Sequence, residues 1–153
     1  MAEIREIIKL GDPLLRQKAA TVQRFNESLA KLLDDMAATM YAANGVGLAA
    51  PQIGISKCVA VVDDAEASGL LELINPQITE RSGHETAIEY CLSVPEIGGE
   101  VVRAATIVVE AQNRFGEPFR LEADGWLARI LQHEIDHLNG TVFIDIMERE
   151  VHD

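Results

Sequence analysis

Apolar residues recur at helical spacing after Asn26, where leucines and methionines fall three or four residues apart along one side of a helix. Asn26 is a typical capping residue and Asn44-Gly45 is a usual helix ending, so we expect a helix between them. A shorter helix is predicted after Asp12-Pro13, because aspartate caps helices and proline fits the first turn. Residues 45–54 are predicted as a loop. The apolar stripe of the longer helix comprises Leu29, Leu32, Leu33, Met36, Ala37 and Met40.

Between Lys57 and about Leu121 the pattern indicates β-structure. Short apolar runs are separated by turn signals such as Ser82-Gly83, Gly98-Gly99 and Phe115-Gly116. The links between these runs are short, which favours antiparallel pairing. The predicted strands are Cys58 to Val62, Leu71 to Asn75, Glu85 to Glu89, Glu100 to Arg103, Thr106 to Ala111 and Pro118 to Glu122.

A second helix is predicted from Gly125 to about Asn139, with Asp124 as its cap and Gly140 just past its end. The fold class is predicted as α+β: a mixed, mostly antiparallel sheet packed around this carboxy-terminal helix, with an amino-terminal helix. The chain has no repeat, low-complexity tract or Pro/Gly/Ser linker. Residues 1–153 are therefore expected to form a single domain.

Charge and hydropathy exclude several classes of partner. The formal net charge is −12 and the sequence pI is near 4.7, which disfavours unspecific binding to nucleic acid or anionic lipid. No apolar run approaches the length of a membrane span, and the charged first residues do not resemble a secretory signal. We therefore expect a cytoplasmic protein with no membrane and no specific nucleic acid as partner.

Two histidines in the last predicted helix are spaced for metal binding. His133 and His137 are four residues apart, so on a helix they lie on the same face, and Glu134 stands between them. This H-E-x-x-H pattern is typical of metal-assisted hydrolysis, with the carboxylate within reach of a metal-bound water. Trp126 and Ile130 fall on the same face of the helix as the histidines.

A catalytic metal held by two histidines needs a third protein ligand. His84 lies in a polar turn and His152 lies at the end of the chain, which is expected to be frayed, so neither is well suited. Cys58 lies in an apolar β-branched run and is interpreted as a core residue, whereas Cys91 has less apolar surroundings. Cys91 is the better candidate, because a thiolate is a strong ligand for iron, zinc, cobalt or nickel.

Three separated segments resemble the motifs of the peptide deformylase family. The stretch from Gly45 to Gln52, GVGLAAPQ, is similar to the first motif, with its two glycines and terminal glutamine. The stretch from Glu89 to Ser93, EYCLS, resembles the second motif, which normally reads EGCLS. QHEIDH, from Gln132 to His137, is the third. The order and spacing also fit, and the resemblance covers nearly the whole chain.

The resemblance implies a metal centre and a reaction. Cys91, His133 and His137 would bind one divalent metal ion, expected to be Fe2+ in cells, with Zn2+, Ni2+ or Co2+ as replacements. Glu134 would act as general base and then as general acid. The implied reaction removes the N-formyl group from the N-terminal formylmethionine of newly made polypeptides and releases formate.

The resemblance also implies how the formyl group is bound. The Gln52 side-chain amide and the Leu92 backbone N–H would donate to the oxyanion that develops on it. Gly47 would belong to the loop that lets the substrate backbone come close.

We further predict that Glu89 and Arg103 form an ion pair that steadies the cysteine strand.

The substrate cleft is predicted from fewer residues. A methionine side chain needs an apolar slot, and Val46, Trp126 and Ile130 are its predicted walls. Tyr90 departs from the family pattern, which has glycine at this position. A positive φ would strain a tyrosine, whereas an extended strand would point it away from Cys91 and let its ring narrow the cleft.

The last residues depart from some bacterial relatives, which end in a basic helix that docks on ribosomal RNA. Here the segment from Met147 to Asp153 is short and acidic. Transient contact with the ribosome is therefore not expected to use such a helix.

Two other functions are open on sequence alone. A zincin-type endopeptidase would cleave unformylated internal peptide bonds, and the Cys91 ligand counts against it. A metal-stabilised peptide-binding relative with reduced or altered activity, its cleft partly filled by Tyr90, would not need both Glu134 and Gln52. Formate release from a short formyl-methionyl peptide distinguishes all three functions.

Overall fold

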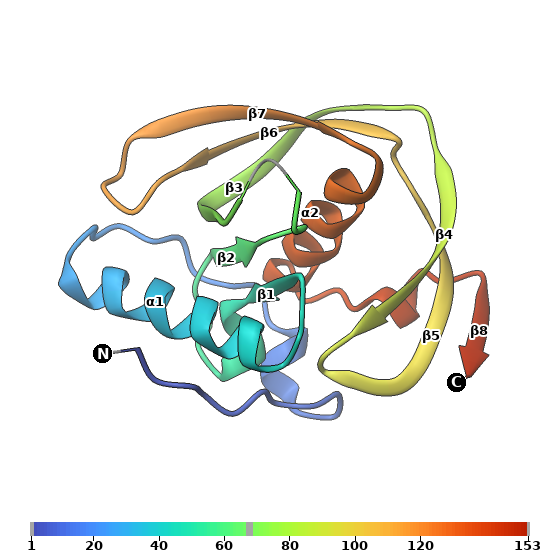
Figure 1. Ribbon diagram of the computed structural model, residues 1–153, viewed down its shortest axis with the longest axis horizontal. Helices are drawn as coiled ribbons and strands as arrows, with labels where there is room; N and C mark the ends of the chain where they lie inside the picture. The colour runs from blue at the N-terminus through green and yellow to red at the C-terminus, as the bar shows by residue number, and fades with distance from the viewer. Residues whose placement is uncertain (1, 67–68, 153) are drawn as a thin grey trace.

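The computed structural model describes residues 2–66 and 69–152, which form two α-helices and two β-sheets (Figure 1). The predicted α+β class is confirmed. The helices are α1 (Glu27–Ala42) and α2 (Gly125–Leu138), with short 3-10 helices η1 (Pro13–Arg16), η2 (Ala50–Ile53) and η3 (Phe143–Asp145). The strands are β1 (Gly47–Ala49), β2 (Val59–Val62), β3 (Leu71–Ser82), β4 (Glu85–Cys91), β5 (Val94–Arg103), β6 (Thr106–Gln112), β7 (Pro118–Asp124) and β8 (Arg149–His152).

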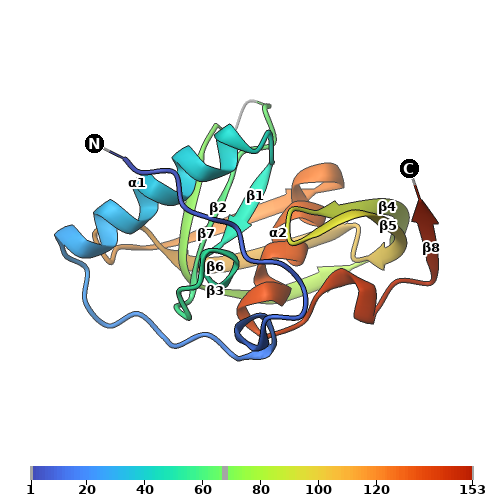
Figure 2. The ribbon, with the colours of Figure 1, turned by 90° about the horizontal axis from the view of Figure 1, so that it is seen from below.

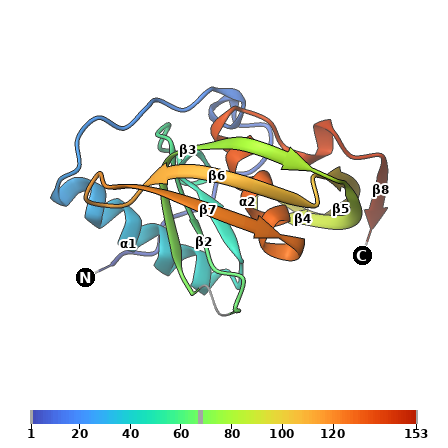
Figure 3. The ribbon, with the colours of Figure 1, turned by 90° about the horizontal axis from the view of Figure 1, so that it is seen from above.

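The strands divide into two separate sheets rather than one. The larger sheet has the order β1-β2-β3-β6-β7, and the smaller has the order β4-β5-β8. Every pairing between these strands is antiparallel, and the one parallel contact among the described residues is an isolated bridge between Ala20 and Lys57. Helix α2 lies between the larger sheet and the β4–β5 hairpin (Figures 2 and 3). One helix thus brings together two sheets that share no strand.

Strand β2 lies between the two helices, which explains its continuous apolar sequence. All four of its residues are buried. Val59 and Val61 pack in the cluster that contains the apolar face of α1, whereas Val62 packs in the cluster that contains α2. Alternate side chains of a strand point to opposite faces, so an apolar residue is needed at each position.

The predicted helix boundaries are close to the observed ones. The Asn26 side chain accepts a hydrogen bond from the Leu29 N–H at 3.2 Å and caps α1. The predicted apolar stripe of α1 is buried except for Ala37, which is half-buried. Asp124 precedes α2, but its side chain makes no capping hydrogen bond and is exposed, and Gly125 follows with a left-handed φ of 56°.

Three further local predictions were wrong. Gly98-Gly99 is not a turn but lies inside β5, because Tyr90 and Met147 cover the two glycines: added Cβ atoms would lie 2.6 Å from Tyr90 Cε1 and 2.6 Å from Met147 Sδ. The predicted loop 45–54 contains β1 and η2, both of which are buried. The carboxy-terminal residues, expected to be frayed, form β8 and pair with β5.

The amino-terminal segment is tied to α1 through Asp35, whose side chain is fully buried. Burial raises the pKa of this carboxyl group. Hydrogen bonds from the Glu3 N–H and from the Arg5 and Lys31 side chains outweigh burial and hold the pKa below its usual 3.8. Asp35 is therefore an ionised anchor at neutral pH. Among the described residues, no helix has both the length and the apolar character needed to cross a membrane.

Candidate active site

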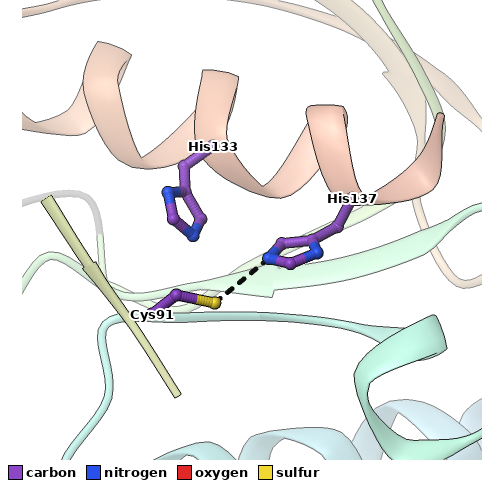
Figure 4. A group of neighbouring side chains, drawn as sticks. All are labelled: Cys91, His133 and His137. Carbon is purple, nitrogen blue, oxygen red and sulfur yellow. Dashed lines mark hydrogen bonds between the residues drawn. The ribbon is translucent and has the colours of Figure 1, made fainter. Parts of the chain in front are cut away.

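Cys91, His133 and His137 converge in the structure, although they come from distant parts of the sequence (Figure 4). Cys91 is the last residue of β4, and the two histidines project from successive turns of α2. Their ligand atoms all lie within 4.8 Å of one another, and Cys91 Sγ is 3.3 Å from His137 Nε2. All three residues are buried. The three residues predicted as metal ligands are therefore brought together in one cluster.

The cluster has the chemistry of a divalent metal site. One sulfur and two imidazole nitrogens suit iron, zinc, cobalt or nickel. Burial lowers the pKa of His133, but its contacts with Cys91 and Glu89 raise that pKa to about 10, whereas burial and the neighbouring His133 lower the pKa of His137 to about 3. The Oε1 atom of Glu134 is buried and has no hydrogen-bond partner among the described residues. A buried polar atom of this kind calls for a ligand or a water beside it.

Glu89 fixes the orientation of the first histidine. Its Oε1 atom lies 2.8 Å from His133 Nδ1, which leaves His133 Nε2 for a metal. Arg103 donates to both carboxylate oxygens of Glu89 at 2.8 Å, so the structure contains the predicted ion pair. Burial raises the pKa of Glu89, but Arg103 and His133 lower it far below the usual glutamate range. Glu89 is therefore an anion that accepts the His133 Nδ1 proton.

Glu134 projects from α2 beside the ligand cluster. Burial raises its pKa to about 7, although the neighbouring His133 lowers it. A carboxyl group with a pKa near neutrality can both accept and donate a proton. Gly47 makes room for this side chain, because a Cβ atom at Gly47 would lie 2.6 Å from Glu134 Oε2. The first and third motifs therefore meet at this contact.

The Gln52 side chain is buried and held from two sides. Its Oε1 atom accepts a hydrogen bond from the Ala49 N–H at 3.0 Å, so its Nε2 donor group faces the cleft. Nε2 donates to Ser93 Oγ at 3.1 Å and lies 3.6 Å from Cys91 Sγ. Leu92 lies beside it in the two-residue turn between β4 and β5. Ser93 was not assigned a role from the sequence, although it belongs to the EYCLS segment.

A cleft of about 410 Å3 opens above the ligand cluster, between strands β1 and β4. Each of these strands is at the edge of its sheet, so in the described part of the chain each has one side without a strand partner. The three predicted walls of the methionine slot, Val46, Trp126 and Ile130, line one recess at the side of this cleft, together with Tyr90. The cleft wall otherwise includes Asn44, Gly45, Gly47, Gln52, Ile88, Leu92, Val94, Pro95 and Glu96.

Tyr90 adopts ordinary extended backbone in β4 and is absent from the described residues with positive φ. Tyr90 is 52% exposed, whereas Glu89 and Cys91 on either side are buried. The ring lies against Gly98 of β5, at the place where a Cβ atom would otherwise stand. Tyr90 therefore points away from Cys91 and forms part of the cleft wall, the second of the two arrangements considered from the sequence.

Comparisons with known proteins agree with this geometry. The family model described as polypeptide deformylase matches residues 4–152. A peptide deformylase of Pelotomaculum thermopropionicum is 56% identical over 142 residues, which cover 93% of this chain and 90% of that protein. One of Carboxydothermus hydrogenoformans is 54% identical, covering 93% and 92%.

Solved structures give the same result. The crystal structure of the peptide deformylase from Thermotoga maritima matches with a TM-score of 0.92 and 45% identity, covering 95% of this chain and 99% of that one. Nothing in these matches favours the endopeptidase or the peptide-binding alternative. The chain is a hydrolase and belongs to the polypeptide deformylase family.

Proposed function

We propose that this enzyme removes the N-formyl group from the N-terminal formylmethionine of newly made polypeptides and releases formate. The observation that carries the proposal is the convergence of Cys91, His133 and His137 below an open cleft, with a buried and unpartnered Glu134 oxygen beside them. A hydrolase that acts on a chain end needs this combination of an accessible slot and a proton-transfer group.

Cys91, His133 and His137 would hold one divalent metal ion, with Fe2+ expected in cells and Zn2+, Ni2+ or Co2+ able to use the same donors. When bound, the ion would lower the pKa of a water molecule and polarise the formyl carbonyl. Glu89 would keep the Nδ1 proton on His133, so that Nε2 stays available as a ligand.

Glu134 would move the protons. Its carboxylate would take a proton from the attacking water and pass it to the departing amine as the formyl C–N bond breaks. The room left by Gly47 places this carboxylate at the edge of the cleft, beside the ligand cluster. The proton transferred in the first step is the one released in the second, so the carboxylate is regenerated.

Gln52 and Leu92 would stabilise the oxyanion. Because Gln52 Oε1 accepts the Ala49 N–H, the amide cannot turn over without losing that bond, and Nε2 remains directed toward the site. The Leu92 backbone N–H would provide the second donor from the β4–β5 turn. Two donors that are fixed before the reaction stabilise developing charge without a reorganisation cost.

The cleft would bind the substrate as an extended strand. The free edges of β1 and β4 offer backbone hydrogen-bonding groups on both sides, which is how peptides add to sheets. The methionine side chain would enter the recess lined by Val46, Trp126 and Ile130, and Tyr90 would contact the residues that follow.

Three further properties belong to the proposal. Residues 1–153 would act as one domain, of which residues 1, 67–68 and 153 lie outside the described part. The enzyme would work in the cytoplasm, where formylated chains are made. Contact with the ribosome would be transient and without specific nucleic-acid binding, since the net charge is −12.

Formate release from a formyl-methionyl tripeptide tests the proposal. Glu134→Ala should retain the metal, because Glu134 is not a ligand, and lose at least about 10²-fold in kcat. An unformylated peptide of the same sequence is the control and should remain uncleaved. Absence of formate from the metal-loaded wild type would overturn the proposed reaction, and cleavage of the control would support an endopeptidase instead.

A further inference from the structure

Glu89 is the centre of a buried ionic network that includes a second arginine. Arg129 Nη1 donates to Glu89 Oε2 at 2.7 Å, the same oxygen that accepts from Arg103 Nε. The other oxygen, Oε1, accepts from Arg103 Nη2 and faces His133 Nδ1. The four side chains are all buried. The carboxylate that orients His133 is therefore itself held by two guanidinium groups from different elements.

Arg129 also binds the backbone of the hairpin that carries Cys91. Its Nη1 donates to the Val101 carbonyl of β5 at 2.9 Å, and its Nη2 donates to the Glu85 carbonyl of β4 at 2.8 Å. Arg129 lies four residues before His133, one helical turn away on the same face of α2. A single side chain thus connects the histidine helix to both strands of the cysteine hairpin.

Apolar packing between these two elements is sparse, which gives the polar contacts more importance. The apolar clusters that contain residues of α2 include none from β4 or β5 among the described residues. Val94 and Val101 of the hairpin pack instead against Val142 and Phe143, which follow α2. The distance between the cysteine strand and α2 is therefore set in large part by hydrogen bonds and ion pairs.

We propose that Arg129 is a positioning residue for the metal centre: it holds Glu89, and through Glu89 the ring of His133, at the orientation that directs Nε2 to the ion. The inference rests on the proposed function only in taking Cys91, His133 and His137 as the ligands. Arg103 shares Glu89 and pairs with Asp136 of α2, but it projects from β5 and does not bind the Glu85 and Val101 carbonyls that Arg129 holds. Arg129 is the arginine of the network that projects from the histidine helix.

The proposal can be tested with Co2+ as probe, which reports on the site without substrate. Arg129→Met should weaken Co2+ binding by about 10- to 100-fold, as the loss of outer partners of metal ligands does. The visible Co2+ absorption bands should shift, because the His133 ring loses its fixed orientation. Arg120→Met is the matched control: Arg120 is exposed, pairs with Glu80 and Glu122 on the larger sheet, and should leave both readouts unchanged.

A double-mutant cycle separates positioning from a loss of general stability. If Arg129 acts through Glu89, Arg129→Met should weaken Co2+ binding much less in a Glu89→Gln background than in the wild type. A purely structural arginine would give the same loss in both backgrounds and an unshifted spectrum, which would overturn the proposal. Wild-type affinity and bands in Arg129→Met would overturn it as well.

Arg129→Lys is a more conservative variant, because it keeps the positive charge in the buried network. A lysine keeps the charge on a single nitrogen and lacks the planar fork whose two nitrogens bind Glu89, Val101 and Glu85, so Co2+ affinity should fall between wild type and Arg129→Met. Urea unfolding of the metal-loaded proteins checks that each variant is native. Normal Co2+ binding without formate release would overturn the proposed reaction and leave the role of Arg129 intact, so the two failures are distinguishable.

Discussion

Gly47→Ala should slow turnover and leave metal binding intact, because the new methyl group would occupy space that the Glu134 carboxylate now fills. A Cβ atom at Gly47 would lie 2.6 Å from Glu134 Oε2, 2.9 Å from Cγ and 3.0 Å from Cδ. Gly47 is not among the residues with positive φ, so alanine fits this backbone without strain. The local effect of the substitution is therefore the contact with Glu134.

The size of the effect follows from the displacement. Ordinary van der Waals contact begins near 3.4 Å, so Oε2 must retreat by roughly 0.8 Å. A misplacement of about 1 Å at a reacting centre can cost about 10²-fold in rate. We therefore expect kcat to fall by about 10- to 100-fold, equivalent to about 1.4–2.7 kcal/mol of transition-state stabilisation.

The assay is formate release from a formyl-methionyl tripeptide, with metal content measured on the same samples. Gly11→Ala is the control: an added Cβ at Gly11 has nothing within 4 Å, and the residue is exposed with φ +110°, so the cost falls on stability rather than on Glu134. A wild-type kcat in Gly47→Ala would refute the reasoning. Metal loss in proportion to the loss of activity would refute it equally.

Three further outcomes are expected. Trp126→Gly should raise KM about tenfold or change the preferred first side chain while metal content stays constant, since it removes a wall of the recess; an equal loss of metal would contradict this role. Ser93→Ala should lower kcat about fivefold, because Gln52 Nε2 loses a partner worth about 1 kcal/mol; unchanged kinetics would show that the amide is held without it. The folded pKa of Asp35 lies below 3.8, so its ionised form stabilises the protein above that pH and the contribution is lost as pH falls further. Asp35→Asn should therefore lower the unfolding free energy at pH 7 and approach the wild type below pH 3.8, as measured by urea unfolding; a constant difference would contradict the assigned pKa.

The helices could be predicted because the spacing of apolar residues and the capping and ending residues are local features of the sequence. The α1 stripe and its Asn26 cap are local features, and the structure confirms both. The turn predicted at Gly98-Gly99 was wrong for a reason that no local pattern contains. Side chains from β4 and from the segment before β8 occupy the space where Cβ atoms of these two residues would lie. Strand β8 was missed because its partner β5 lies some fifty residues earlier in the chain. In both cases, contacts between distant segments outweighed the local sequence features that had indicated a turn and a frayed chain end.

The ligand cluster could be predicted because its chemistry is carried by residue type and spacing. Two histidines at helical spacing leave only a few candidates for a third ligand, and Cys91 lies where that argument placed it. Arg129 could not be found in this way. An arginine on a helix is usually exposed, and only the position of the hairpin shows that this one is buried and pairs with Glu89. Residues such as Arg129, which contact the hydrogen-bond partner of a candidate ligand, are positioned by tertiary packing and cannot be found from sequence spacing.

The alternation of side chains along β4 separates the tasks of three neighbouring residues. Glu89 and Cys91 point inward, where one orients His133 and the other joins the ligand cluster, while Tyr90 points to the cleft wall. The ring of Tyr90 requires glycine at position 98, so the departure at position 90 is compensated within the same hairpin. We infer that a substitution at Tyr90 changes which peptides fit without changing the metal ligands, because neither Glu89 nor Cys91 has to move to accommodate it.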